Sequence, residues 1–358
     1  MTEHLPPSIV TPAPGQGALG VQCRAGDARV LGALAHLHDE TTARCVTAER
    51  AVLLGLGGGC SMPLGVLVEP VGERWRLQAA LFGGEPNAAM REAAVDDDPA
   101  AMARAVVERW RPLVGAPLQD LRIATIRPDG ERSGLTAAMA IAGADVTALA
   151  WTRTEAVDVD GAQLHAALER AAALDGALAF TSTRAVRSFV DACRAHDAAP
   201  FSLRTFAVGS ATASELVRAG FVNVSAARGR GGDALATVCA ERGVRQVAMP
   251  CAAARHGGFE QRAAAAGIDA LALPCYRLLD APRDPSGVPA DLDAVLFTSP
   301  SAVKAWCDAT PGARGLAAVA IGETTGAASR ERGFEAITTL TEPSPAALIE
   351  ALSRVSKS

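Results

Sequence analysis

The sequence contains an internal repeat, which limits the possible fold more than any other of its features. Residues 121–153 match residues 245–277, and Ile123, Gly143 and Arg153 each find an identical or similar residue 124 positions later. Two further pairs of segments follow in the same order, AFTSTRAVRSF (179–189) with LFTSPSAVKAW (296–306) and FAVGSATASELVRAGF (206–221) with VAIGETTGAASRERGF (319–334). Three matched pairs in one order predict two copies of a single architecture.

Each repeated segment has the pattern of a strand, a turn and a helix. Residues 178–180 form an apolar run, and Ser182 after them is a natural N-cap for a helix. Residues 206–208 form a second apolar run, followed by the turn Gly209-Ser210 and by a helix that Gly220 ends. Strands that alternate with helices of this length form right-handed βαβ units and a parallel sheet. We therefore predict two doubly wound α/β lobes, with ligand sites beyond the carboxyl ends of their strands.

The first hundred or so residues have a different pattern, and the Pro- and Gly-containing stretch 111–120 separates them from the repeat. Residues 27–56 are predicted to be helical, with Cys45, Ala48, Val52 and Leu56 on one face. After this helix the sequence predicts three strands and a last helix: Leu64–Val68, Trp75–Phe82, Met90–Val95 and Pro99–Leu113. This part is predicted to be a small α+β domain with a three-stranded antiparallel sheet.

Composition excludes several classes of protein. Hydrophobic residues make up 49% of the 358, and the net charge of −5 argues against a nucleic-acid-binding protein. The sequence has no apolar run long enough to cross a membrane and no signal-peptide pattern at its start. Eight cysteines are scattered with no CxxC pair, as expected of reduced thiols in the cytoplasm. We predict a cytoplasmic protein without a metal site, a nucleic-acid partner or a membrane partner.

The repeated part, about residues 118–355, resembles uroporphyrinogen-III synthase. The segments that carry the resemblance are TIRPDGERSGL (125–135), AFTSTRAV (179–186), FAVGSATASEL (206–216), CYR (275–277), LFTSPSAV (296–303), AIGETT (320–325) and EPSPAAL (342–348). The resemblance implies two flavodoxin-like doubly wound lobes joined by a two-stranded connector. It places the first lobe in residues 118–150 plus 279–358 and the second in residues 155–274, with Leu149–Thr154 and Pro274–Leu278 as the connector.

Residues 1–115 resemble the C-terminal part of hydroxymethylbilane synthase, also called porphobilinogen deaminase. The matching segments are LPPSIVTPAPGQGALGVQCR (5–24) and HDETTARCVTAERAVLLGLGGGCSMPLG (38–65). The resemblance implies that Cys60 can carry a dipyrromethane cofactor through a thioether. The earlier domains of that family, which supply a catalytic aspartate and substrate-binding arginines, have no counterpart in this sequence. We therefore expect a fusion of the end of one enzyme of tetrapyrrole synthesis to the whole of the next enzyme.

The resemblance to the synthase implies a reaction and a set of site residues. Hydroxymethylbilane, a linear tetrapyrrole rich in carboxylates, would lose water and close with inversion of ring D, with no cofactor or metal. Tyr276 matches a tyrosine of the family and would protonate or hydrogen-bond the leaving hydroxyl, although it would equally suit packing in the connector. Hydroxyls at helix N-termini, and an arginine in 125–135, are expected to bind substrate carboxylates, or else simply to cap their helices. These residues are Arg127, Ser182, Ser210, Ser299, Thr324 and Thr325.

Two other functions fit the same sequence. In one, a separate chain supplies the missing deaminase domains and makes a bifunctional system, and the chain contacts a hydroxymethylbilane synthase at least transiently. In the other, the two lobes form a non-catalytic binding protein, since two hinged α/β lobes also describe solute receptors. Three other motifs are not assigned a function. GQGALG (15–20) matches the dinucleotide-binding pattern GxGxxG, but it does not open a helix after a strand. His36 and His38 could suggest a metal site but lack further ligands, and Arg228 and Arg230 could reach substrate carboxylates but better suit a solvated loop.

Overall fold

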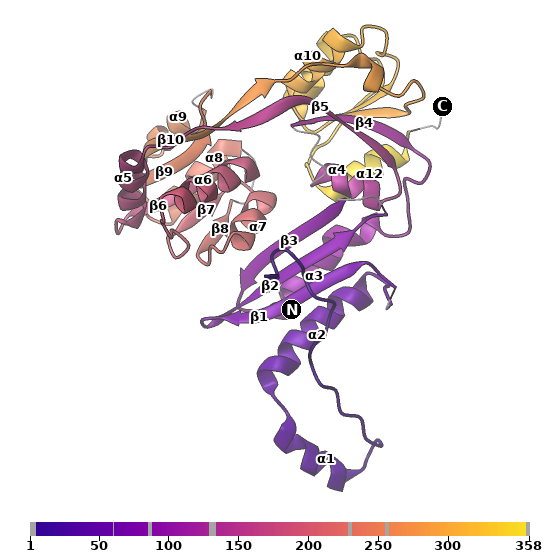
Figure 1. The fold of residues 1–358 in the computed structure, drawn as a ribbon, viewed down its shortest axis with the longest axis vertical. Coiled ribbons are helices and arrows are strands. Elements are labelled where there is room, and N and C mark those ends of the chain that lie inside the picture. Colours follow the sequence, from indigo (N-terminus) through magenta and orange to yellow (C-terminus); the bar gives the residue numbers. More distant parts are fainter. Residues whose placement is uncertain are drawn as a thin grey trace. The chain divides into compact units, whose positions relative to one another are not determined.

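The computed structural model describes residues 5–59, 61–84, 88–128, 134–227, 231–254 and 258–355. It divides into two compact units (Figure 1). The N-terminal unit comprises residues 1–82 and 91–111, and the C-terminal unit comprises residues 83–90 and 112–358.

The N-terminal unit is a three-stranded sheet covered by two helices. Its elements are α1 (Ala28–Leu34), η1 (Ala35–Leu37), α2 (Glu40–Gly55), β1 (Leu64–Val71), β2 (Arg74–Phe82), β3 (Ala89–Asp96), α3 (Pro99–Trp110) and η2 (Arg111–Leu113). The sheet order is β1-β2-β3, and the β1–β2 hairpin turns at Gly72, whose φ of 62° lies in the left-handed region. The predicted α+β domain is confirmed. The helical face that carries Cys45, Ala48, Val52 and Leu56 is buried, as predicted.

The prediction of continuous helical structure over residues 27–56 is wrong at one place. The chain is extended at His38 and Asp39, with ψ angles of 125° and 111°. The Asp39 carboxylate accepts a hydrogen bond of 2.6 Å from the Thr42 N–H and so begins α2 there. An aspartate that caps a new helix ends the preceding one, because an N-cap residue has non-helical dihedral angles.

The C-terminal unit contains one ten-stranded sheet. Its strand order is β13-β12-β11-β4-β5-β10-β9-β6-β7-β8. The strands are β4 (Arg122–Pro128), β5 (Asp145–Ala156), β6 (Gly176–Phe180), β7 (Thr205–Ala207), β8 (Val224–Ala226), β9 (Gln246–Ala252), β10 (Asp269–Asp280), β11 (Ala294–Phe297), β12 (Ala317–Ala320) and β13 (Ile337–Thr339). The helices are α4 (Leu135–Ile141), α5 (Gly161–Ala172), α6 (Thr183–Ala195), α7 (Ser210–Arg218), α8 (Gly231–Glu241), α9 (Gly258–Ala265), η3 (Pro285–Gly287), α10 (Pro300–Ala309), α11 (Glu323–Glu331) and α12 (Pro345–Ser353).

The sheet consists of two halves that share one topology. We call β4, β5 and β11–β13 the first lobe and β6–β10 the second lobe. From the middle of the sheet outward, each lobe has β5 or β10, then β4 or β9, then three short strands. With β4 or β9 counted as strand 1 and β5 or β10 as strand 2, this is the flavodoxin-like order 2-1-3-4-5. Each lobe thus takes two strands from one sequence repeat and three from the other.

The long strands β5 and β10 form the connector between the lobes. Each pairs in parallel within its own lobe and then antiparallel with the other, from Tyr276 opposite Ala156 to Asp280 opposite Thr152. The two strands run side by side in Figure 1. The predicted two doubly wound lobes with a two-stranded connector are therefore confirmed.

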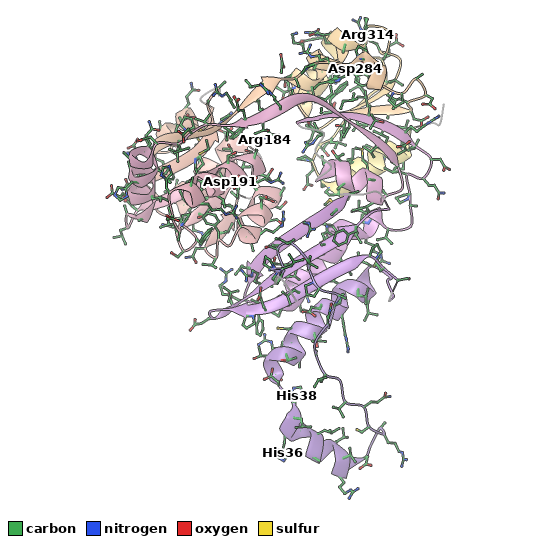
Figure 2. The ribbon with its side chains drawn as sticks, in the orientation of Figure 1. His36, His38, Arg184, Asp191, Asp284 and Arg314 are labelled. Carbon is green, nitrogen blue, oxygen red and sulfur yellow. The ribbon has the colours of Figure 1, made fainter. Side chains whose placement is uncertain are left out.

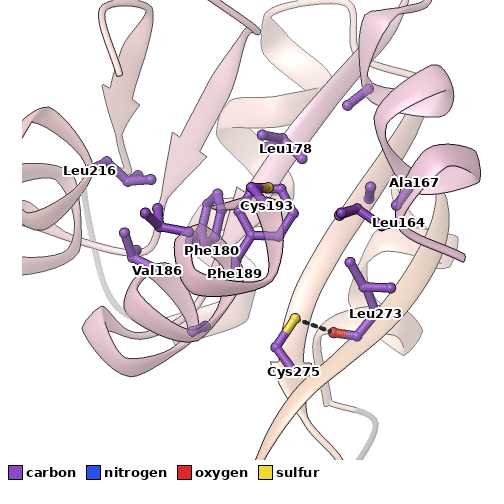
Figure 3. Packing of buried hydrophobic residues seen from close by; sticks show 14 of the residues in the cluster. Leu164, Ala167, Leu178, Phe180, Val186, Phe189, Cys193, Leu216, Leu273 and Cys275 are labelled. Atoms are coloured by element: carbon purple, nitrogen blue, oxygen red, sulfur yellow. Dashed lines mark hydrogen bonds between the residues drawn. The ribbon is translucent and has the colours of Figure 1, made fainter. Parts of the chain in front are cut away.

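Both faces of the second lobe are buried under helices. Leu178 and Phe180 of β6 pack against α5 and α6, whereas Ala177 and Ala179 pack against α8 and α9. Figure 3 shows the first of these clusters, in which Phe180 meets Phe189 edge to face at 5.5 Å between ring centroids. Burial on both faces explains why this strand is continuously apolar rather than alternating.

Candidate functional site

Two serines at matching positions of the repeat cap helices beyond the carboxyl ends of their strands. Ser182 follows β6, and its Oγ accepts a hydrogen bond of 3.1 Å from the Ala185 N–H at the start of α6. Ser299 follows β11, and its Oγ accepts one of 3.2 Å from the Ala302 N–H at the start of α10. Both serines are only partly buried, so each hydroxyl combines a capping role with access to solvent.

Tyr276 contacts one of these serines directly. Its hydroxyl lies 3.3 Å from Ser182 Oγ, across 94 residues of sequence. The whole residue is 6% exposed and belongs to the core of the second lobe, so the ring is held by packing. Since Ser182 Oγ already accepts the Ala185 N–H, the two hydroxyls form the outer end of a short hydrogen-bond chain that leads back to the helix.

The backbone around Tyr276 fixes where its side chain lies. Tyr276 pairs with Ala252 of β9 on one side and with Ala156 of β5 on the other, where β10 passes from its parallel to its antiparallel partner. A β-bulge between Pro274 and Tyr276 shifts the register at this point, and the Tyr276 carbonyl accepts a hydrogen bond of 2.7 Å from the Ala253 N–H. Bulges re-aim side chains, and they are frequent beside active sites.

Arg184, on the first turn of α6, is a site residue that the sequence analysis missed. Its guanidinium carbon lies 5.8 Å from the centroid of the Tyr276 ring, within the range of a cation–π contact, and Figure 2 labels it on this helix. It stands two residues after the predicted Ser182, so its position in the strand–turn–helix pattern was the signal that could have found it.

Helices α7 and α11, which occupy matching positions of the repeat, each have a glycine as their N-cap. Gly209 caps α7 and Gly322 caps α11, and neither N-terminus receives a side-chain capping hydrogen bond. Their φ angles of −178° and −175° are ordinary extended values, and a Cβ built on either would meet no atom within 4 Å. Neither steric crowding nor backbone conformation within the described chain requires glycine here. The open space at both Cβ positions and the lack of a side-chain cap leave these two N-termini able to receive an anion.

The predicted residues beside these glycines differ in exposure. Ser210 and Thr324 are exposed at the starts of α7 and α11, whereas Thr325 is 3% exposed and faces the interior. Glu323 forms an ion pair with Arg330 on its own helix, which directs the carboxylate along the helix. The negative charge at this turn is therefore balanced locally.

Arg127 is a half-buried residue near the carboxyl end of β4, and the loop after it, residues 129–133, lies outside the described residues. Strand β4 pairs in parallel with β11, and the Thr125 hydroxyl donates a hydrogen bond of 3.0 Å to the Leu296 carbonyl. Arg127 and Ser299 therefore belong to the same edge of the sheet. Neighbouring β4 and β11 form the point where the strand order reverses, which is where such sheets bind ligands.

The topology thus groups the predicted residues by lobe. Arg127, Ser299, Thr324 and Thr325 follow adjacent strands of the first lobe, and Ser182, Ser210 and Tyr276 belong to the second. The structure brings Ser182 and Tyr276 into direct contact. Cys60, Arg228 and Arg230 lie outside the described residues.

Three buried cysteines of the second lobe do not suit nucleophilic or metal chemistry. Burial raises the pKa of the Cys193, Cys239 and Cys275 thiols to about 12, so they remain protonated near neutral pH. Within the described ranges no three His, Cys, Asp or Glu residues come close enough to hold a metal ion. Nor does the described part of the chain include a helix long and apolar enough to cross a lipid bilayer.

Fold and site together define a two-lobed α/β protein with paired helix N-termini at the carboxyl edges of its strands. The sequence model described as "Uroporphyrinogen-III synthase HemD" matches residues 133–350, which is more than half of the chain. The chain therefore belongs to the uroporphyrinogen-III synthase family. A second model, "Porphobilinogen deaminase, C-terminal domain", matches residues 43–108. Both predicted resemblances are confirmed.

Curated porphobilinogen deaminases match a short part of the chain. Porphobilinogen deaminases of Mycobacterium tuberculosis and Mycobacterium avium are 54% identical over 71 residues, or 20% of this chain. The chain spans 23% and 22% of their respective lengths. Among solved structures, a mutant uroporphyrinogen III synthase from Thermus thermophilus is 21% identical over 65% of this chain and 98% of its own, with a TM-score of 0.43. The Helicobacter pylori synthetase is 18% identical over 64% and 97%, with a TM-score of 0.44.

Proposed function

We propose that this chain is a lyase that converts hydroxymethylbilane to uroporphyrinogen III with loss of water and inversion of ring D. The observation that carries the proposal is the match of the synthase family over residues 133–350. Family membership also favours an enzyme over a non-catalytic two-lobed binding protein. We propose further that the reaction requires neither a metal nor a cofactor.

The proposed mechanism relies mainly on positioning. Loss of the substrate hydroxyl as water leaves an electrophilic azafulvene, and simple closure of the chain without inversion needs no enzyme. The protein must therefore hold the linear chain so that the substituted carbon of ring D attacks the azafulvene. The older bond from that carbon to the bridge to ring C then breaks, and the released bridge bonds to the free carbon of ring D with loss of a proton, which leaves the ring inverted. The uncapped N-termini of α7 and α11 and the hydroxyls beside them would bind substrate carboxylates.

Tyr276 is the proposed proton donor to the leaving hydroxyl. Its phenol is the only tyrosine hydroxyl of the chain, and packing and the contact with Ser182 hold it in one place. Departure of the hydroxyl as water needs one proton, and a positioned phenol can supply it or hydrogen-bond the developing water. Ser182 then acts as a positioning residue that orients the phenol while capping α6.

The test of the proposed function is the product isomer. Purified protein incubated with hydroxymethylbilane, without added metal or nucleotide, is expected to yield mainly the III isomer. A heat-denatured sample provides the control, since spontaneous closure gives the I isomer. A product with only the I isomer, from protein shown to be folded by circular dichroism, would refute the assignment.

Substitution of the two contacting hydroxyl residues should separate their roles. Tyr276→Phe is expected to lower the initial rate by about ten- to a hundred-and-fifty-fold, which corresponds to one lost hydrogen bond to a charged group, about 1.5–3 kcal/mol. Ser182→Ala should lower the rate less, but should also reduce stability by about 1 kcal/mol because it removes the cap of α6. The measurements are initial rates, I-to-III ratios and thermal unfolding. Complete inactivation by Ser182→Ala with unchanged stability would contradict this division of roles.

We expect the chain alone not to condense porphobilinogen. Its N-terminal unit corresponds to less than a quarter of the length of the deaminases it matches. Cys60, the proposed attachment point for dipyrromethane, is outside the described residues. Whether Cys60 carries dipyrromethane is tested separately from porphobilinogen consumption. Consumption of porphobilinogen by pure protein would show the expectation to be wrong. The intact mass would show whether Cys60 carries an adduct.

The cytoplasmic location of the protein also stays a prediction, and it rests on the scattered cysteines of the sequence.

A further inference from the structure

Arg184 differs from the other two arginines of α6 in how its charge is paired. Arg187 Nε lies 2.7 Å from Glu215 Oε1, and Arg194 Nη1 lies 3.0 Å from Asp191 Oδ1. Arg184 is half-buried, and in the part of the chain that the structure describes no carboxylate forms an ion pair with it. Its positive charge is therefore not neutralised by the described residues.

The position of Arg184 on its helix makes this charge unfavourable. It stands on the first turn of α6, which contains no acidic residue. The N-terminus of a helix carries a partial positive charge, so anions are favourable there and cations are favourable at the other end. Arg194, in the last turn of α6, follows this rule, and Arg184 breaks it. Residues that break a local rule of stability are expected at functional sites.

The matching turn of the first lobe shows that the fold does not need this arginine. TSTRAV (181–186) corresponds to TSPSAV (298–303), which places Ser301 where the second lobe has Arg184. Both helices begin in the same way, because Ser182 and Ser299 each cap their helix through Oγ. The Ser301 hydroxyl lies 2.9 Å from Ser299 Oγ and is uncharged. The two lobes therefore share this turn but differ in its charge.

Arg184 also lies beside the proposed proton donor. Its guanidinium carbon is 5.8 Å from the centroid of the Tyr276 ring, and the Tyr276 hydroxyl is 3.3 Å from Ser182 Oγ. Tyr276 is 6% exposed and held by packing, so its ring gives the arginine a fixed neighbour. A cation–π contact does not use the five N–H donors of a guanidinium, which can then bind a carboxylate through two parallel hydrogen bonds.

We propose that Arg184 binds a carboxylate of ring A, the substrate ring that carries the leaving hydroxyl. The inference rests on the proposed function and on Tyr276 as the proton donor. If the phenol protonates this hydroxyl, ring A lies against Tyr276, and its acetate and propionate side chains come within reach of the guanidinium. The bound carboxylate supplies the negative charge that the first turn of α6 lacks. Arg184 is then a specificity-determining residue, through which the second lobe receives the hydroxymethyl end of the linear substrate.

A cycle that combines one protein variant with one substrate analogue tests this inference. The full chain and its Arg184→Gln variant are each assayed with hydroxymethylbilane and with an analogue in which both ring A carboxylates are methyl esters. Either change alone should lower kcat/KM roughly tenfold or more, as loss of a hydrogen bond between charged groups does. Because both changes remove the same contact, Arg184→Gln should lose little more with the ester. The loss should lie mainly in KM, since the contact forms when the substrate binds.

Two further variants separate the charge of Arg184 from its effect on the fold. Arg194→Gln is the matched control, because it removes an exposed arginine from the other end of the same helix, and it should leave kcat/KM unchanged with both substrates. Arg184→Lys keeps the charge without the planar guanidinium and should retain part of the affinity. The thermal midpoint of Arg184→Gln should stay close to that of the parent protein, since a cation at this end of a helix does not stabilise it.

Two results would overturn the inference alone. Equal losses by Arg184→Gln with both substrates, mainly in kcat, would show that the arginine acts through the Tyr276 ring and not on a substrate carboxylate. An unchanged kcat/KM for Arg184→Gln would show that no ring A carboxylate reaches it. In both cases the parent protein still forms the III isomer, so the proposed function stands. A parent protein that forms only the I isomer would refute the proposed function, and this inference with it.

Discussion

Replacement of Glu49 by alanine is expected to destabilise the N-terminal unit by about 2–4 kcal/mol, since it leaves one buried and one partly buried N–H donor unpaired. Glu49 is 5% exposed, and its two carboxylate oxygens accept hydrogen bonds from backbone groups far apart in sequence. Oε1 accepts the Val68 N–H at 2.8 Å and Oε2 accepts the Gly15 N–H at 2.7 Å. The side chain therefore joins α2 both to β1 and to the chain at Gly15, which precedes α1.

Segment-resolved hydrogen exchange measures this effect, because tryptophans occur in both units and fluorescence would mix their signals. Glu49→Gln should be intermediate, since its amide keeps one acceptor oxygen for one of the two donors. Glu108→Ala, an exposed glutamate on α3, is the matched control and should change stability by less than about 0.5 kcal/mol. Equal destabilisation by Glu49→Ala and Glu108→Ala would show that the carboxylate does not join these segments.

The sequence repeat predicted the lobes well because their strands are short, apolar and buried on both faces. The apolar run of such a strand and the turn residues after it can be recognised in the local sequence, as in residues 178–180 and the following Ser182. The repeat alone did not show that each lobe draws strands from both copies. That exchange depends on β5 and β10 each continuing past its own lobe to pair with the other, which no local pattern encodes.

The break between α1 and α2 is a feature that the apolar pattern of the sequence failed to predict. Apolar periodicity predicted one helical segment over residues 27–56, because the spacing of apolar residues continues across the break. Asp39, an N-cap residue placed before α2, was visible in the sequence and carried the correct signal. Helix boundaries follow capping more closely than they follow periodicity.

The contact between Ser182 and Tyr276 could not have been predicted from either residue. Ser182 was found from its place after a strand, and Tyr276 from a resemblance to a family. Their 3.3 Å separation depends on the bulge at Pro274 and on the sheet order that brings β10 near β6 through β9. These are long-range features, so the sequence could identify the two residues but not that they touch.

The second large effect is expected from placing aspartate at both glycine-capped helices, Gly209→Asp and Gly322→Asp. Open space around both positions and their extended backbone mean that the new side chains cause no clash. Aspartate is a good N-cap and suits the helix dipole, so stability should stay the same or rise by a few tenths of a kcal/mol. If the N–H groups at the starts of α7 and α11 bind substrate carboxylates, the aspartate carboxylates occupy the same positions and repel the substrate. The double variant should lose about a hundredfold or more in rate, since each lost charged hydrogen bond costs roughly tenfold or more.

Asparagine at the same two positions separates charge from size. Gly209→Asn and Gly322→Asn fill the same space and can cap the same N–H groups, but they carry no charge. Their rates should lie between those of the parent protein and the aspartate variants, and the gap to aspartate should narrow as salt is raised, because screening weakens repulsion. The measurements are initial rates at two ionic strengths and thermal unfolding of each variant. Equal rates for aspartate and asparagine would mean that no anion approaches these helices. Gly209 and Gly322 would then have no role in substrate binding, and neither their dihedral angles nor their surroundings would explain why glycine stands there.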